Sequence, residues 1–262
     1  MATKRNFREK VILFSQRALP VIAFMLLWEF TSRMEVVNPR LFPAPTIVFS
    51  ALVEWVRSGE LWRDVTASYW RMFVGYLFGG VLGVMLGMIT GRNRLINRSL
   101  SSLIQLFRPL PPVAIIPLII VWLGIGDTAK IFSIAFAVFF PVWINTHLGA
   151  SSVAPIYLWS AQTLCQSKVK IALRVLFPAV LPSIVAGLRT AIATAFIMVY
   201  VAEIAGASSG IGYRISVMHL AYRIDKMMAA LLILALAGAL ADFLFAQAIR
   251  RAFPWTTLER KS

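Results

Sequence analysis

Charged residues are scarce in this sequence, and so are cysteine and histidine. Only 14% of the 262 residues are Asp, Glu, Lys or Arg, against roughly 25% in an average soluble domain. One cysteine and two histidines exclude a disulfide framework and a metal site built from thiolates and imidazoles. Intrinsic disorder is excluded as well, because 59% of the residues are apolar. These absences leave a polytopic membrane protein.

The charge that is present is mostly positive, with 26 Lys and Arg against 11 Asp and Glu and a net charge of +15. A basic balance of this size can indicate a nucleic-acid partner. A mean hydropathy of +0.77 argues against one, because such a protein needs a polar surface around its basic patch. We therefore expect contact with membrane lipids and no nucleic-acid partner.

Six apolar segments have about the length needed to cross a membrane, where roughly 20 residues span about 30 Å of hydrocarbon. The sequence therefore predicts an all-α polytopic membrane protein with six transmembrane helices. The first segment is the shortest, and prolines break the third. The predicted spans are residues 18–30, 69–90, 103–123, 129–148, 181–205 and 227–249.

Lysine and arginine are divided unequally between the predicted loops. Most of them lie in the N-terminus (1–17), in the loop after the second span, in the loop 149–180 and in the tail (251–262). Cytoplasmic loops are enriched in these residues, so both termini are predicted to be cytoplasmic. The chain then consists of a basic N-terminus, a six-span domain over residues 18–250 and a short tail.

The second span carries a glycine at every fourth position, from Gly75 to Gly91. A row of residues without side chains allows another helix to approach closely. We expect packing along this row and no direct contact with a solute.

The third span contains Arg108 followed by Pro109, Pro111 and Pro112, so a regular helix cannot run through it. Broken backbone at membrane depth is tolerated only where protein or a water-filled cavity surrounds it. Arg108, Pro111 and Pro112 are therefore candidates for a substrate pathway, with Arg108 as a fixed charge for an anion. In the alternative, Arg108 extends to the cytoplasmic headgroups.

Two acids lie in the last two spans, where a charge normally faces the bundle interior and has a partner. Glu203 is expected either in an outer gate with Arg214 or Arg223, or in a structural ion pair. Asp242 is close enough in sequence to Arg250 to pair with it. Asn145, Tyr200 and Glu203 are the further candidates for lining the pathway.

The loop 149–180 is too long for a simple connection between two helices. Its sequence predicts two short helices over residues 156–176, with Leu158, Ala161 and Leu164 at helical spacing. An amphipathic helix pair on the cytoplasmic side is typical of a docking element. The alternative is a helix lying on the inner leaflet.

The segment 206–210 fits the G-x-S-x-G pattern of a serine hydrolase, and His219 follows Ser208. That motif requires a strand before it, whereas an apolar helix is predicted here. An intramembrane serine hydrolase is the alternative from another functional class. The sequence lacks a P-loop motif, so it has no such site for ATP.

Several motifs together resemble the integral-membrane permease subunits of bacterial ATP-binding-cassette importers, in the sulfonate, taurine, nitrate and bicarbonate group. The resemblance covers about residues 41–251. Its motifs are LFPAP at 41–45, RPLPPVAIIPL at 108–118, WLGIGD at 122–127, VLFPAVLP at 175–182, AGLR at 186–189, AE at 202–203 and GIGY at 210–213.

The family's cytoplasmic signature has Glu-Ala-Ala, a glycine four residues later and a proline at its end. Its spacing falls on residues 159–178 here, but Trp159 replaces the acid and Cys165 the glycine. The resemblance implies that this loop is a coupling helix that docks in a groove of an ATPase subunit. The residues assigned to coupling are Trp159, Ser160, Ala161, Leu164, Cys165, Lys168 and Pro178.

The resemblance also implies a complex in the plasma (inner) membrane of a bacterium. It would contain two permeases (a homodimer or a pair), two ATPase subunits and a periplasmic or lipoprotein solute-binding protein. The partner ATPase would use ATP, and this chain would bind no cofactor and catalyse no reaction. The expected solute is a small anion, with an alkanesulfonate or taurine ranked above nitrate or bicarbonate.

Overall fold

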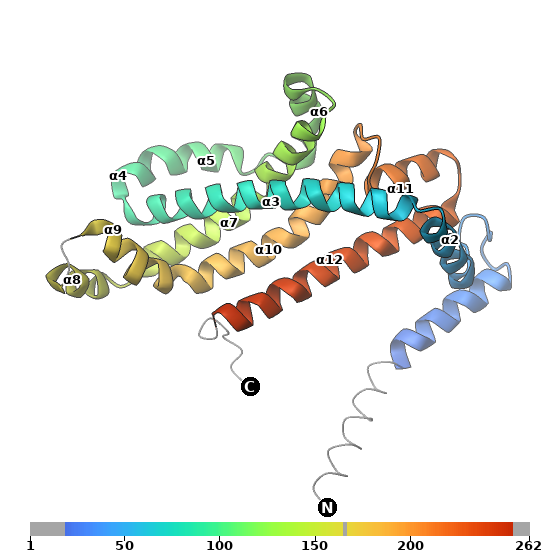
Figure 1. The fold of residues 1–262 in the computed structure, drawn as a ribbon, viewed down its shortest axis with the longest axis horizontal. Coiled ribbons are helices and arrows are strands. Elements are labelled where there is room, and N and C mark those ends of the chain that lie inside the picture. Colours follow the sequence, from blue (N-terminus) through green and yellow to red (C-terminus); the bar gives the residue numbers. More distant parts are fainter. Residues whose placement is uncertain (1–18, 165–166, 254–262) are drawn as a thin grey trace, which may run out of the picture. The chain divides into compact units, whose positions relative to one another are not determined.

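The computed structural model describes residues 19–164 and 167–253, and within them it contains helices and no strand (Figure 1). The chain divides into two units, residues 1–62 with 215–232 and residues 63–214 with 233–262.

The first unit contains a helix over residues 19–33, α2 (Pro45–Arg57) and the segment that joins α11 (Ile211–Leu220) to α12 (Ile224–Ala252). Pro45 begins α2, where its fixed φ and missing N–H suit a first helical turn. Val48 and Ala51 are buried against Ala229. The turn before α2 is fixed by hydrogen bonds from the side chains of the 19–33 helix, such as Ser32 Oγ to the Phe42 carbonyl at 2.8 Å.

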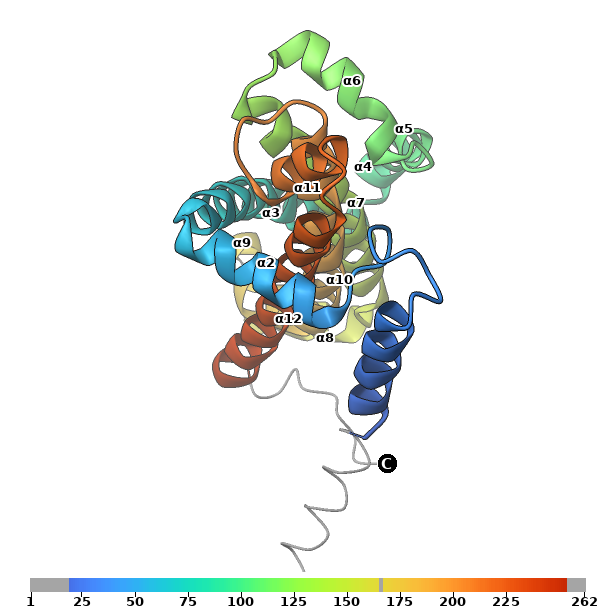
Figure 2. The ribbon, with the colours of Figure 1, turned by 90° about the vertical axis from the view of Figure 1, so that its right-hand side faces the viewer.

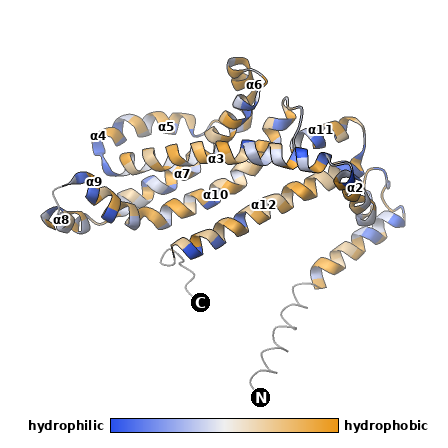
Figure 3. Cartoon of the chain, viewed as in Figure 1, coloured by the Kyte–Doolittle hydropathy of each residue, from blue (hydrophilic) through white to orange (hydrophobic). Residues whose placement is uncertain are grey.

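The second unit is built on three long helices, α3 (Glu60–Arg92), α7 (Asp127–Ser152) and α10 (Phe177–Ile204). Hydrophobic residues run along them and along α12 (Figure 3). Their core includes Ile134, Val138, Ala195 and Val199, all fully or almost fully buried. We call the two ends of this helix set the Asp127 end and the Ser152 end, after the first and last residues of α7.

The glycine row of α3 packs against α7, as predicted. A Cβ on Gly75 would lie 2.7 Å from the Cβ of Ile134, and one on Gly87 would lie 2.6 Å from the Cβ of Thr146. Real side chains do not approach so closely, so glycine is required for this helix contact.

The third predicted span is a bent pair of helical segments. The first segment contains α4 (Arg94–Ile96), a π-helical turn (Asn97–Ser101) and α5 (Ser102–Phe107), and the second is α6 (Pro112–Leu123). The two meet at 94°, so α6 leaves the direction of α5 (Figures 1 and 2) and packs against α7 and α10. The prolines that were expected to break this span lie at the bend.

Within residues 19–164 and 167–253, four helices are long and apolar enough to cross a membrane, and the bent pair makes a fifth candidate. They contain the predicted spans two to six. The predicted first span lies in the helix over residues 19–33, which begins where the described residues begin. An all-α polytopic membrane protein is confirmed.

The loop expected at 149–180 is more helical than predicted. It contains α8 (Pro155–Leu164), but the second short helix is not separate: α9 (Lys168–Ile171) and a π-helical turn (Ala172–Leu176) continue into α10. Together they form one helix from Lys168 to Ile204. The π-helical turn ends two residues before Pro178, whose missing N–H cannot close an α-helical hydrogen bond.

Candidate functional site

A buried polar network lies at the Asp127 end of the second unit. The Arg71 side chain, only 5% exposed, places Nη1 2.8 Å from Glu203 Oε1 and Nε 2.8 Å from Asp127 Oδ1. It therefore ties α3 to the start of α7 and to the end of α10. A charge pair buried in this way needs every remaining polar atom to be satisfied.

Glu203 meets that condition. Ser68 Oγ lies 2.8 and 2.9 Å from the two carboxylate oxygens, and the Gly212 N–H donates to Oε2 at 2.8 Å. The Glu203 side chain has no exposed surface. Glu203 therefore belongs to the buried network and does not contact water.

The expected partners of Glu203 were wrong. Arg214 instead places Nη2 2.8 Å from Asp64 Oδ2, and Arg223 pairs with Asp225 at 2.9 Å. Arg71 is the partner of Glu203, in the ion pair that was the stated alternative, and sequence reasoning missed it because it considered only arginines close to Glu203 in the sequence. The available signal was its position inside the predicted span 69–90, where a charge requires a partner.

The segment 205–210 is a turn held by the same network. Gly206 and Gly210 have φ angles of 148° and 126°, which disfavour a side chain. The Arg71 guanidinium donates to the Ser209 carbonyl at 2.7 Å, and the Gly210 N–H donates to Asp64 Oδ1 at 3.0 Å. The preceding element is the helix α10, so Ser208 does not lie on the strand–turn–helix elbow of a hydrolase.

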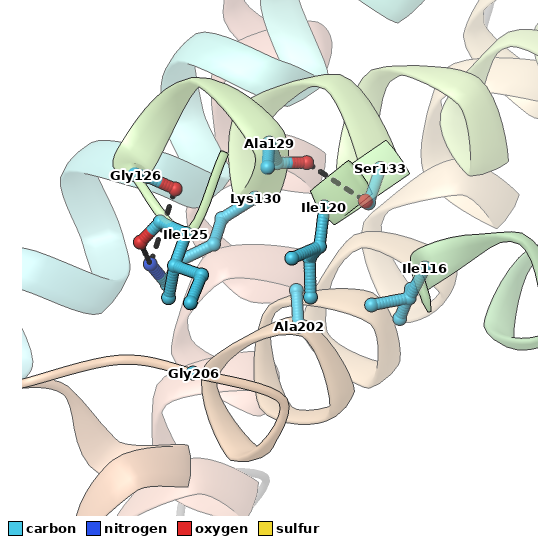
Figure 4. A pocket seen from close by; sticks show the side chains of 9 residues that line it. All are labelled: Ile116, Ile120, Ile125, Gly126, Ala129, Lys130, Ser133, Ala202 and Gly206. Carbon is cyan, nitrogen blue, oxygen red and sulfur yellow. Dashed lines mark hydrogen bonds between the residues drawn. The ribbon is translucent and has the colours of Figure 1, made fainter. Parts of the chain in front are cut away.

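A small pocket lies beside this network, between the end of α6, the start of α7 and the end of α10 (Figure 4). Isoleucine and alanine form most of its wall. Its cation, Lys130, donates to the carbonyls of Gly126 at 3.1 Å and Ile125 at 3.4 Å. Ser133 donates to the Ala129 carbonyl at 2.8 Å. These groups are engaged within the chain, so the pocket offers no free charge to a solute.

Arg108 follows α5 at the bend and is exposed, while Pro111 caps α6 and Pro112 begins it. One turn earlier, Ile104 is buried with Phe140, which lies halfway along α7. Phe140 is about 18 Å from the Ser152 end at 1.5 Å per residue. At that distance from the Ser152 end, Arg108 is better placed to act as a charge in a pathway than to contact lipid headgroups at that end. Arg108 has no ion-pair partner in the described part of the chain.

Asn145 and Tyr200 lie in helix contacts. Asn145 Nδ2 donates to the Pro141 carbonyl at 2.8 Å, and a Cβ on Gly187 would lie 2.9 Å from the Asn145 Cβ. The backbone of Tyr200 packs against Gly212. Their pathway role stays a prediction.

The predicted coupling residues lie on α8 and on the first turns of the helix that follows it. Trp159 and Leu164 are 62% and 89% exposed, whereas Leu158 is buried and Ala161 is half-buried. The helix predicted for Leu158, Ala161 and Leu164 is confirmed, but the first two pack on the chain's own core and only Leu164 of the three is exposed. Ser160 and Lys168 are exposed, Pro178 is half-buried, and Cys165 lies outside the described residues.

Asp242 pairs with Arg189 and not with Arg250. Arg189 Nε and Nη2 lie 2.9 Å from the two carboxylate oxygens of Asp242, while Arg250 donates to Gln247. Sequence reasoning gave Arg189 no role beyond its place in a motif. It is a basic residue inside the predicted fifth span, and that was the signal to find it.

The comparisons with known proteins agree with this architecture. The family model described as the inner membrane component of binding-protein-dependent transport systems matches residues 79–253. The chain belongs to this family. It is therefore a permease subunit of an ATP-binding-cassette importer, as the sequence motifs suggested.

Two relatives extend the match beyond the family model. The permease is 36% identical over 224 residues to the putative aliphatic sulfonates transport permease SsuC of Escherichia coli K12, which covers 86% of this chain and 85% of that one. It is 32% identical over 237 residues to the SsuC of Bacillus subtilis 168, with 90% and 86% covered.

A solved structure supports the fold. The inward-facing MetNI methionine transporter superposes with a TM-score of 0.60 at 21% identity, covering 75% of the permease and 96% of that chain. The permease is a transport subunit and not an enzyme, and ATP is hydrolysed by a separate partner. The serine hydrolase alternative is not supported.

Proposed function

We propose that the permease forms the translocation pathway for a small anion of the alkanesulfonate or taurine class. The two relatives described above are named for aliphatic sulfonates. Nitrate and bicarbonate are the alternative solutes, and the uptake experiment below separates them.

The observation that carries the anion proposal is the unpaired charge of Arg108 at the bend of a broken span. An exposed guanidinium at this depth, with no carboxylate partner in the described ranges, attracts an anion and repels a cation. Pro111 and Pro112 keep the backbone broken beside it. We propose Asn145 and Tyr200 as further polar groups of the route, and Glu203 as the residue that fixes its Asp127 end.

The distribution of Lys and Arg supports an orientation for the chain. With both termini in the cytoplasm of a bacterium and the spans in its plasma (inner) membrane, the Ser152 end faces the cytoplasm. The lipid-facing surface is then the exposed apolar surface of helices such as α12.

On this orientation α8 lies in the cytoplasm, where we propose that it docks on the ATPase. The exposed Trp159 and Leu164 supply an apolar surface, and Ser160, Ala161, Cys165, Lys168 and Pro178 belong to the same segment. An exposed indole replaces the signature carboxylate, so we expect docking to depend on buried apolar area. The alternative, α8 lying on the inner leaflet, predicts assembly that is insensitive to these side chains.

The fold supports a mechanical connection between α8 and the pathway. Leu158 of α8 is buried with Ile171 and Leu176, and these two belong to the helix that continues to Ile204. A displacement of α8 by the ATPase would therefore move a continuous helix that ends at the Arg71–Glu203 network. Alternating access then needs no covalent step in this chain.

The proposed complex contains two permeases, as a homodimer or a pair, with two ATPase subunits and a periplasmic or lipoprotein binding protein. We propose that the permease itself binds no cofactor. A C-terminally tagged permease extracted in mild detergent should copurify with a P-loop ATPase in stoichiometric amount. Purification of a folded permease without any ATPase would contradict this.

The solute is tested by uptake. The purified complex and its binding protein are reconstituted into liposomes with ATP inside, and labelled ethanesulfonate, taurine, nitrate and bicarbonate are compared. We expect ATP-dependent uptake of a sulfonate. Uptake of nitrate or bicarbonate in its place would reassign the solute, and uptake of none of these anions would refute the proposal.

A further inference from the structure

The Arg189–Asp242 pair lies near the middle of two spanning helices. Arg189 is 15 residues before the end of α10, about 22 Å, and 21 residues after Lys168, about 31 Å. Asp242 is ten residues before the end of α12, about 15 Å, and 18 residues after its start, about 27 Å. Both charges therefore lie within the hydrocarbon depth.

The pair is nevertheless open on the surface of the second unit, with side chains 58% and 42% exposed. This differs from the Arg71–Glu203 pair, whose side chains are 5% and 0% exposed. Charged groups at membrane depth face protein or water and not lipid, because lipid contact is expensive. The surface that carries Arg189 therefore faces a water-filled route or another protein surface.

The exposed residues around Arg189 on α10 are small. Ala186, Thr190 and Ala193 are exposed one turn or less away on the same helix face. The opposite face of α10 is occupied by α7, where Gly187 meets Asn145. On α12 the exposed residues beside Asp242 are Ala239, one turn earlier, and the large apolar Leu240 and Phe243.

The geometry of the pair fits a site that an anion can take over. The guanidinium holds the carboxylate through two parallel hydrogen bonds of 2.9 Å. A sulfonate or another small oxyanion presents oxygens that match the same fork. Because both side chains remain open on the surface of the second unit, a sulfonate can reach the guanidinium and exchange for the carboxylate of Asp242.

We propose that Arg189 is a second anion-binding residue of the pathway, with Asp242 as the counter-ion that occupies it when no solute is present. This inference rests on the proposed import of an anion. The solute displaces Asp242 from Arg189, and Asp242 returns as the solute leaves, so the charge is never left uncompensated at membrane depth.

The first test separates solute binding from a structural ion pair. Arg189→Gln and Asp242→Asn remove the same pair, but only the first removes the cation. In the reconstituted complex with saturating loaded binding protein, we expect sulfonate uptake to fall about tenfold or more in Arg189→Gln. It should stay within about threefold of the parent in Asp242→Asn.

Two controls accompany that comparison. Arg223→Gln removes an Arg–Asp pair at the first turn of α12, away from the middle of the span, and should leave uptake unchanged. Copurification of the ATPase and its stimulation by the binding protein report assembly. Equal losses in Arg189→Gln and Asp242→Asn, or parent uptake in both, overturn the proposal. A parent complex that imports no anion refutes the proposed function instead.

The second test does not need an active variant. The variants Arg189→Cys and Leu240→Cys are treated with a membrane-impermeant anionic thiol reagent, methanethiosulfonate ethylsulfonate. The labelling of the parent protein, which comes from Cys165, is subtracted from that of each variant. We expect Cys at position 189 to react at least about tenfold faster, because thiolates form in water and not in lipid. Equal labelling rates at the two positions would overturn the assignment. So would slower labelling of position 189 after two copies of the permease are crosslinked, because that surface would then face the second copy and not a water-filled route.

Discussion

Replacing Arg71 with methionine tests the buried network most directly. The substitution leaves the Glu203 carboxylate, whose side chain is 0% exposed, without its cation at 2.8 Å. Removal of one partner from a buried pair typically costs about 3–5 kcal/mol. Ser68 and the Gly212 N–H still bond Glu203, so we expect a value near the lower limit, about 3 kcal/mol.

A loss of that size should lower the Tm of the detergent-solubilised permease by about 6–12 °C, at about 2–4 °C per kcal/mol for a chain of this length. The double variant Arg71→Met with Glu203→Gln should recover part of the loss, because no buried charge then lacks a partner. Thermal unfolding followed by tryptophan fluorescence measures both.

The matched control is Arg223→Met, which removes an exposed pair worth about 0–1 kcal/mol. If Arg71→Met lowers the Tm no more than this control does, the network does not stabilise the Asp127 end. The reasoning from burial would then be refuted.

Three further predictions follow from the helix contacts and the proposed function. Gly79→Ala should lower the Tm by a few degrees, because its Cβ would overlap the Ala135 carbonyl oxygen. Gly238→Ala is the control and should leave the Tm unchanged, because its Cβ would lie 3.6 Å from Phe196. Equal Tm values for the two variants would contradict the close α3–α7 contact. Leu164→Arg should abolish copurification of the ATPase while membrane insertion is unchanged, because the side chain is 89% exposed on α8; unchanged assembly would refute the docking role. Arg108→Gln should reduce sulfonate uptake about tenfold, and Arg108→Lys should reduce it less because the cation remains; uptake at the parent rate in both variants would remove Arg108 from the pathway.

Much of the fold could be predicted because membrane insertion imposes simple rules on sequence. Apolar length predicted the C-terminal ends of spans two to six within four residues, whereas the helices of spans two, three and five begin nine or more residues earlier than predicted. The glycines from Gly75 to Gly91 predicted a close helix contact, since a bare face has a direct packing consequence. The prolines after Arg108 predicted the broken span, because each removes a backbone donor.

Partner choice among charges could not be predicted in the same way. Glu203 was expected to pair with arginines near it in sequence, yet its partner Arg71 lies 132 residues away on α3. Asp242 was expected to pair with Arg250, yet it pairs with Arg189 at a separation of 53 residues. Charge and spacing restrict such pairs only within one helix.

The sequence by itself determined that this protein is an all-α membrane permease, because hydropathy, glycine spacing and motifs are local properties of the chain. Only the tertiary structure decided which charges are buried and which remain open, because that depends on how α3, α7, α10 and α12 pack. It buried Glu203 with Arg71, left Arg189 and Asp242 exposed at membrane depth, and joined Lys168 to Ile204 in one helix.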